Sequence, residues 1–457
     1  MKAFTEPLLS LAGFEEMTKT AEKSSGLISV TGCIDAQKSQ MIYAFGGHRK
    51  NKLIVTFGEQ KAKELYDEYS FFDKEVVYYP SKDVLFYQSD IRGNLLTAER
   101  IRALKAIREQ ESVTLVTTFD ALMNTMAPIE KMWENVLTLE QGQLLDLKEI
   151  QAALIRMGYE KEYQVQTMGQ FSVRGGILDV FPLTEENPIR IELWGDEIDT
   201  IRYFDCESQK SIENIDRVSI YPAAELVLSD EEKAGGIDKL KAEAKRVSDK
   251  LRKQMKTEEA HRVTVMADEL TEEWGELSMY AGMDAFLSYF FDERVGILDY
   301  FNPSDSIIFF DELTRCVEQG KLTETEFSES MKQRLAMGYI LPGQMNGLFT
   351  EKEIVAKLGK YSCIALGALD NKANGLHQLG SYGIHCQSVS PYNNSFELLI
   401  KDLKRYKKNG YRVILLSGSR TRAKRLSEDI TDQGITCFYT ENYDHELFEG
   451  QIMVCYG

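Results

Sequence analysis

Short apolar runs alternate with helical patterns in the first 135 residues. Residues 27–32 (LISVTG) form an apolar run that ends in glycine, and residues 36–46 follow with helical spacing. LIVTF at 53–57, EVVYYP at 75–80 and VTLVTT at 113–118 repeat the β-rich pattern, with helical stretches such as 98–110 between them. Strands that alternate with helices form a parallel sheet covered on both faces, so residues 1–135 are predicted to begin an α/β domain.

The pattern changes to closely spaced strands after residue 135. QFSVRGGILDVFP, PIRIELW, EIDTIRYFD and DRVSIYP follow one another, separated by Gly, Pro and acidic turns. The residues GDE at 195–197 suit a tight hairpin, because glycine tolerates the positive φ of such turns. These features predict a small α+β domain with an antiparallel sheet, inserted at residues 136–222.

The α/β pattern returns over residues 223–392. Residues 237–255 carry apolar side chains at helical spacing with charged residues between them, which predicts a long amphipathic helix. Its charged face is either a basic nucleic-acid contact or simply solvated, and we favour the second. SIIFFDEL at 306–313 and YSCIALGAL at 361–369 are predicted buried strands.

Residues 393–457 are predicted to form a separate small α/β domain, with the order helix, strand, helix, strand, strand. The sequence stops inside an apolar run, which is unusual for a natural C-terminus. We therefore expect it to be part of a longer protein.

Composition narrows the classes of function. A net charge of −18 repels a phosphate backbone at long range, which disfavours duplex binding. The seven cysteines include no C-x-x-C pair, so we expect their thiols to be reduced, as in a cytosolic protein. The five histidines show no metal-ligand spacing, so we expect no metal site. Neither a signal peptide nor an apolar stretch of about 18 residues is present, so a cytoplasmic protein without a membrane span is predicted.

The first turn of the α/β domain partly matches a phosphate-binding loop. The template G-x-x-x-x-G-K-[ST] holds phosphates with backbone amides and the lysine, and magnesium with the hydroxyl. Gly32, Lys38 and Ser39 match it, but Gln37 stands at the second glycine. A side chain there would crowd the β-phosphate and disfavour the backbone of the loop. The motif is therefore interpreted as a vestigial nucleotide site.

An acidic pair on a later strand adds context to this motif. Asp311 and Glu312 end a predicted strand, where a nucleotide hydrolase orders magnesium and polarises water. The same pair is otherwise explained as an acidic helix cap. An active hydrolase that uses Lys38, Asp311 and Glu312 is thus an alternative, but the substitution at Gln37 favours a decayed motor domain without catalytic residues.

The inserted sheet carries a different signal. Arg190, Glu192 and Trp194 alternate along one strand and therefore share a face. Arg and Trp are enriched among residues that dominate binding energy, so a partner-binding face is predicted, although Trp194 could instead cover the edge of its own domain. Arg174 precedes Gly175 and Gly176; we expect its strand to lie next to that of Arg190, so that the two arginines share a patch.

The order of these parts resembles the amino-terminal module of the bacterial transcription-repair coupling factors (Mfd), which is itself similar to the repair protein UvrB. The resemblance rests on FSVRGGILDVFP, IRIELWGDEIDTIRYFD and SIYPAAE. It implies a degenerate P-loop, helicase-like (RecA-like) domain with an inserted domain that docks UvrA. The positions that match the docking surface are Arg174, Arg190 and Trp194, the last usually Phe.

The resemblance also implies what this part of such a protein lacks. YYPSKDVLFYQSDIRGN leads into the next helix without the long aromatic-rich hairpin that probes damage in UvrB relatives, which implies loss of lesion recognition. RNA polymerase, double-stranded DNA, ATP and magnesium would be bound by domains that follow residue 457, among them a C-terminal domain that masks the docking surface. The expected function is an adaptor that recruits UvrA to stalled polymerase; the rivals are an active helicase and a lesion-sensing DNA binder.

Overall fold

A seven-stranded parallel sheet forms the centre of the protein, as the computed structural model describes it for residues 1–46, 49–82, 94–276, 282–369 and 374–457. The strand order is β15-β1-β14-β13-β2-β4-β3, and every neighbouring pair is parallel. The bounds are β1 Gly26–Thr31, β2 Asn51–Thr56, β3 Val77–Tyr79, β4 Thr114–Thr118, β13 Ser306–Asp311, β14 Ser362–Gly367 and β15 Gln378–Gly383. The predicted α/β class is confirmed, and strands from both sides of the insertion join one sheet.

Both faces of this sheet are covered. Along β2, Leu53 and Val55 belong to one buried apolar cluster and Ile54 to another, as the two-residue period of a strand requires. The helices of this domain are α1 Lys2–Leu9, α2 Phe14–Lys23, α3 Asp35–Gly46, α4 Glu59–Tyr69, α5 Asn94–Glu109, α6 Phe119–Met123, α7 Ile129–Glu134, η1 Met283–Phe286, α11 Leu287–Phe290, η2 Ile297–Tyr300, α12 Leu313–Ala336, η3 Pro342–Asn346 and α13 Glu351–Leu358. Of these, η1 and α11 pack against the long helix α9 (Asp230–Lys253), and the others surround the sheet.

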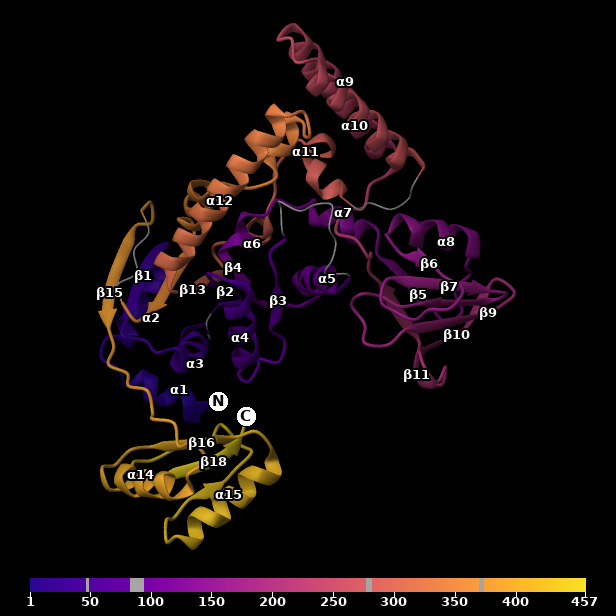
Figure 1. Cartoon of the computed structure of the whole chain (residues 1–457). Coiled ribbons are helices and arrows are strands. Elements are labelled where there is room, and N and C mark those ends of the chain that lie inside the picture. The colour runs from indigo at the N-terminus through magenta and orange to yellow at the C-terminus, as the bar shows by residue number, and fades with distance from the viewer. Residues whose placement is uncertain (47–48, 83–93, 277–281, 370–373) are drawn as a thin grey trace.

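The insertion forms a second body with a six-stranded sheet, drawn to the right in Figure 1. Its strand order is β11-β10-β9-β8-β7-β6, antiparallel except for β6 with β7. The elements are β5 Leu137–Glu140, α8 Leu147–Arg156, β6 Glu160–Lys161, β7 Gln170–Arg174, β8 Ile177–Val180, β9 Ile189–Trp194, β10 Glu197–Phe204, β11 Ser211–Ile215 and β12 Arg217–Ile220. The hairpin at 195–197 is confirmed: Trp194 pairs with Glu197, and Gly195 has φ +66°.

Two long helices form an antiparallel pair that projects from the body, at the top of Figure 1. They are α9 (Asp230–Lys253) and α10 (Thr257–Glu276). Ser229 and Glu232 form a capping box that fixes the start of α9. The predicted helix is therefore confirmed, and it begins seven residues before position 237.

A three-stranded parallel sheet, ordered β16-β18-β17, forms the third body at the bottom of Figure 1. Its elements are α14 Phe396–Lys408, β16 Val413–Ser417, α15 Arg420–Asp432, β17 Phe438–Tyr439 and β18 Ile452–Tyr456. It contacts the N-terminal segment: Ala3 and Phe4 share a buried cluster with Met453 and Cys455. Among the described helices, none is long and apolar enough to cross a membrane.

The structure bears on two further sequence predictions only for the residues that it describes. Most of the stretch YYPSKDVLFYQSDIRGN, in which no damage-probing hairpin is expected, falls on residues 83–93, outside the described residues. Where side chains are described, no group of three or more His, Cys, Asp or Glu is arranged to hold a metal. All seven cysteines are free thiols.

Candidate functional site

The turn between β1 and α3 is short and closely covered. Gly32 has φ +81°, and a Cβ there would lie 2.1 Å from the carbonyl oxygen of Ile384, so only glycine fits. The amides of Gly32 and Cys33 donate to the carbonyls of Ala368 and Gly367 at 3.3 and 3.1 Å. Helix α3 already begins at Asp35. The amides that a phosphate-binding loop would supply at Gly32 and Cys33 are thus used within the chain.

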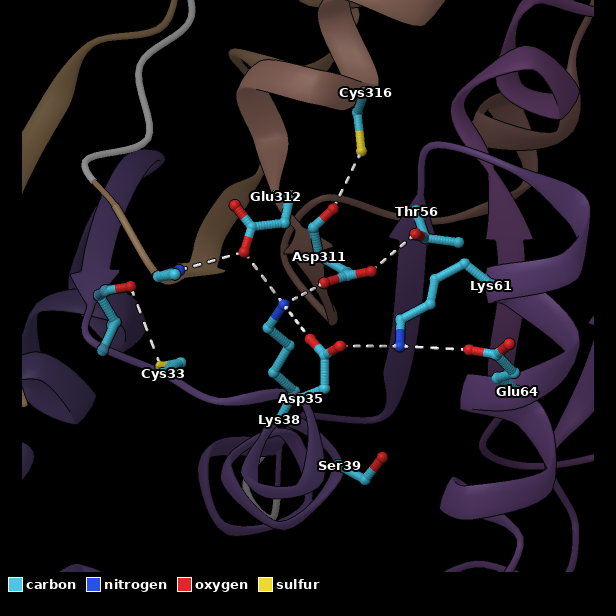
Figure 2. A network of polar contacts seen from close by, with 12 residues as sticks. Cys33, Asp35, Lys38, Ser39, Thr56, Lys61, Glu64, Asp311, Glu312 and Cys316 are labelled. Atoms are coloured by element: carbon cyan, nitrogen blue, oxygen red, sulfur yellow. Dashed lines mark hydrogen bonds and ion pairs between the residues drawn. The ribbon is translucent and has the colours of Figure 1, made fainter. Parts of the chain in front are cut away.

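The buried side chain of Lys38 lies at the centre of an ionic cluster (Figure 2). Its Nζ contacts Asp311 Oδ1 at 2.5 Å, Asp35 Oδ1 at 2.9 Å and Glu312 Oε1 at 3.2 Å, and its side chain is 2% exposed. Thr56 donates to the other oxygen of Asp311 at 2.8 Å. The predicted meeting of the lysine with the acidic pair does occur, and the ammonium is bonded to carboxylates.

The balance of charges keeps Lys38 protonated. Burial by itself lowers the pKa of Lys38, but the carboxylates of Asp311, Asp35 and Glu312 outweigh burial and raise it above its ordinary value. Glu312 is held in the left-handed backbone region, with φ +56°, and its Oε1 also accepts from the amide of Ala368 at 3.1 Å. The cluster therefore ties β13 and the residues after β14 to the first turn of α3.

Gln37 and Ser39 have partners outside this cluster. Gln37 lies in the first turn of α3, where its side-chain oxygen accepts a hydrogen bond from Cys386. The hydroxyl of Ser39 donates to Glu68 of α4 at 3.3 Å, and Figure 2 shows Ser39 apart from the acidic pair. In this arrangement the Lys38 ammonium contacts carboxylates, and these ion pairs would have to break before it could contact a phosphate.

The inserted sheet holds a second cluster, built on a buried carboxylate that the sequence analysis did not single out. Asp179 of β8 is 1% exposed and accepts from Arg174 Nη2 at 3.0 Å and from Arg190 Nε and Nη2 at 2.7 and 2.8 Å. One carboxylate thus fixes two guanidinium groups. An acidic residue inside the apolar run GGILDV was the available signal.

One expectation about this sheet is wrong. We expected the strand of Arg174 to lie next to that of Arg190, but β8 lies between β7 and β9. The two arginines still share a face, because Arg174 is opposite Ile177 and Arg190 is opposite Asp179 in the register. Their contact runs through the intervening strand. Strand order is set by pairing along the whole sheet and not by local pattern.

The two arginines differ in exposure. The side chain of Arg190 is 12% exposed, lies over the ring of Phe204 and donates to Gln209 at 2.8 Å. Its hydrogen bonds to Asp179 raise the pKa of Arg190 above its ordinary value. Arg174 is 37% exposed and lies 5.9 Å from the ring centroid of Tyr163, which is 83% exposed. Arg174 is therefore the arginine that a partner could reach.

Trp194 is the most exposed of the three predicted docking residues. It is 84% exposed at the end of β9, which decides against the interpretation that it covers its own domain. Glu192 stands between Arg190 and Trp194 on the same face and pairs with Arg202, whose hydrogen bond lowers the pKa of Glu192. The face thus combines satisfied ion pairs with exposed aromatic rings at Tyr163 and Trp194.

A third cluster lies where the inserted domain rejoins the main sheet. Glu225, in the segment after β12, accepts from Arg100 of α5 at 2.7 and 3.1 Å and pairs with Lys82 at 3.0 Å. Arg100 is fully buried, stacks 4.0 Å above Tyr79 and donates to the carbonyl of Pro80. These contacts fix the junction between the two domains.

Comparison with known proteins agrees with this architecture. Residues 137–226 match the family model described as UvrB interaction domain, which overlaps the predicted insertion. The transcription-repair-coupling factor of Bacillus subtilis (strain 168) is 26% identical over 406 residues, covering 88% of this chain and 34% of that protein. Those of Staphylococcus haemolyticus and Staphylococcus aureus (strain MRSA252) are 26% identical over 440 and 435 residues, covering 94% and 92% of the chain.

The resemblance to the UvrB-like module of transcription-repair coupling factors is therefore confirmed. The chain spans about a third of the length of the curated relatives it matches: 34%, 36% and 35% of the three named above.

Proposed function

We propose that this chain is the adaptor module of a transcription-repair coupling factor, and that it recruits UvrA to RNA polymerase stalled at DNA damage. RNA polymerase, double-stranded DNA, ATP and magnesium would be engaged by other domains of the longer, cytoplasmic parent protein. That parent would use ATP to translocate on DNA and displace the polymerase. A C-terminal domain of the same parent would mask the docking face at rest.

The exposed ring of Trp194 on the polar face of the inserted sheet carries this proposal. Arg190 and Glu192, which share this face with Trp194, are already paired within the sheet, whereas the ring of Trp194 is 84% exposed. The apolar surface of the ring is removed from water only when a partner covers it. Arg174 donates to Asp179 through Nη2, and its side chain is 37% exposed, so its guanidinium can also supply a charge-assisted hydrogen bond to an acidic group of that partner. Arg190 is mostly buried and supports this face through its hydrogen bonds to Asp179.

We further propose that the first domain serves as a scaffold without its own ATPase. The Lys38 cluster supports this, since the positive charge of the lysine is balanced by the carboxylates of Asp35, Asp311 and Glu312. The rival, an active helicase with Lys38, Asp311 and Glu312 in catalysis, requires that nucleotide break the buried ion pair of Lys38 with Asp311 and the more exposed contacts of Lys38 with Asp35 and Glu312. A lesion-sensing DNA binder is disfavoured by the net charge of −18.

Binding of purified UvrA to immobilised wild-type chain tests the main proposal. Trp194→Ala is expected to weaken UvrA binding about 30-fold, the effect of removing a central aromatic contact worth about 2 kcal/mol. Val389→Ala is the matched control, because Val389 is also exposed, at 60%, but lies outside the inserted domain. Equal binding by wild type and Trp194→Ala, or no binding by wild type, would contradict the proposal.

A further inference from the structure

A groove of about 640 Å³ opens beside Trp194, on the inserted domain. It runs between the turn after β9, the start of β10 and the paired strands β5 and β12. Its walls are held by backbone hydrogen bonds: Gly142 donates to Ile198, and Gln141 donates to Asp216, at 2.8 and 2.9 Å. The groove is thus part of the folded sheet edge, with the exposed indole as one of its sides.

The charge of this groove is unbalanced. Glu197, Asp199 and Asp216 line it and are all exposed, and where the chain is described none of the three pairs with a Lys or Arg. The remaining acid, Glu140, is paired with Arg217 at 3.1 Å. Carboxylates of the same sign held in one groove repel one another, and this arrangement contrasts with the arginine face, where each acid has its cation.

We propose that this groove receives a lysine- or arginine-bearing segment of the protein that docks on Trp194, an inference that rests on the proposed function. The cationic group would lie over the face of the Trp194 ring, where a cation is attracted by the ring quadrupole, and would pair with the free carboxylates. The docking surface then has two halves of opposite character: Arg174 for an acidic group, and the groove for a basic one.

Other occupants fit the groove less well. Nucleic acid is repelled by the three carboxylates. A single divalent cation needs several ligands converging within about 2 to 2.6 Å, and the described residues contain no such group of three or more. A flexible basic side chain meets neither obstacle, because it reaches each carboxylate separately and its aliphatic stem packs on the indole.

The test measures UvrA affinity for the whole chain at several salt concentrations. The double variant Glu197→Lys with Asp199→Lys is expected to bind about tenfold or more weakly and to lose part of the salt dependence of binding. Glu186→Lys with Glu213→Lys makes the same change in net charge at two exposed acids outside the groove, and is expected to bind within about twofold of wild type.

Two further results separate the possible outcomes. Glu197→Gln with Asp199→Asn removes the charges without introducing new ones, so an intermediate loss of affinity supports the proposal even if the reversed variant folds poorly. Equal affinity of wild type and both groove variants overturns the groove and leaves the proposed function standing. Failure of wild type to bind UvrA overturns both.

Discussion

Asp179 accepts two hydrogen bonds from Arg190, at 2.7 and 2.8 Å, from a position that is 1% exposed. The pair joins adjacent strands directly opposite each other in the register. Because Arg174 binds the same carboxylate from the other side, the proposed docking face is organised by a buried group that a partner does not reach. This relationship separates the residues proposed to contact a partner from the residues that hold them in place.

Arg174 and Arg190 should therefore respond differently to substitution. Arg190→Ala leaves Asp179 with one guanidinium and should lower the free energy of unfolding by about 2 to 3 kcal/mol. Arg174→Ala, at a side chain 37% exposed, should lower it by less than about 1 kcal/mol while weakening UvrA binding. Urea unfolding and binding measured on the same samples check this. Equal losses of stability would contradict the distinction.

Asp179→Asn keeps the size of the side chain but removes its charge. Two guanidinium groups then share a neutral acceptor, and the expected cost is about 1 to 3 kcal/mol of stability, together with weaker UvrA binding. Asp196→Asn, in the exposed turn after Trp194, is the matched control and should leave stability within about 0.5 kcal/mol of wild type. Unchanged UvrA affinity in a folded Asp179→Asn variant would show that the contacts of Asp179 with Arg174 and Arg190 do not serve docking.

Lys38→Met should destabilise the protein by about 3 to 5 kcal/mol, because it leaves Asp311 buried without its cation. Lys63→Met changes a lysine that is 62% exposed and should alter stability by no more than about 0.5 kcal/mol. In the wild type, calorimetric titration with ATP and magnesium should show no binding. Tight binding, lost in Lys38→Met, would contradict the vestigial nucleotide site and favour the rival hydrolase.

The junction cluster predicts a loss of stability in acid. Burial alone raises the pKa of Glu225, but Arg100 and Lys82 outweigh burial and lower the pKa from 4.5 to about 2. A depressed folded-state pKa contributes stability above the unfolded value, and this contribution is lost as the pH falls from about 4.5 toward about 2. Urea unfolding across this range should show the loss in wild type.

Glu225→Gln should be less stable at neutral pH and should show a shallower decline in acid, because the titrating carboxylate is gone. Glu231→Gln, the same change at an exposed site at the start of α9, should keep the slope of the wild type. Parallel slopes for wild type and Glu225→Gln would remove Glu225 as the origin of the acid response.

Much of the architecture could be predicted from local pattern. The alternation of Arg190, Ile191, Glu192 and Leu193 set the two faces of β9, since the side-chain period of a strand is two residues. Apolar spacing predicted α9 and the buried strands β13 and β14. The edge strand β15 was missed, because QLGSYG is poor in the apolar and β-branched residues that mark a strand.

The sequence by itself determined which side chains share a face, because that depends on the period of one element. Only the tertiary structure decided which faces meet. Lys38 and Asp311 are 273 positions apart, and β8 places Asp179 between two arginines that local pattern had put on adjacent strands. Sheet order and long-range register are set by the packing of the whole chain, so the ionic clusters that define both candidate sites arise there.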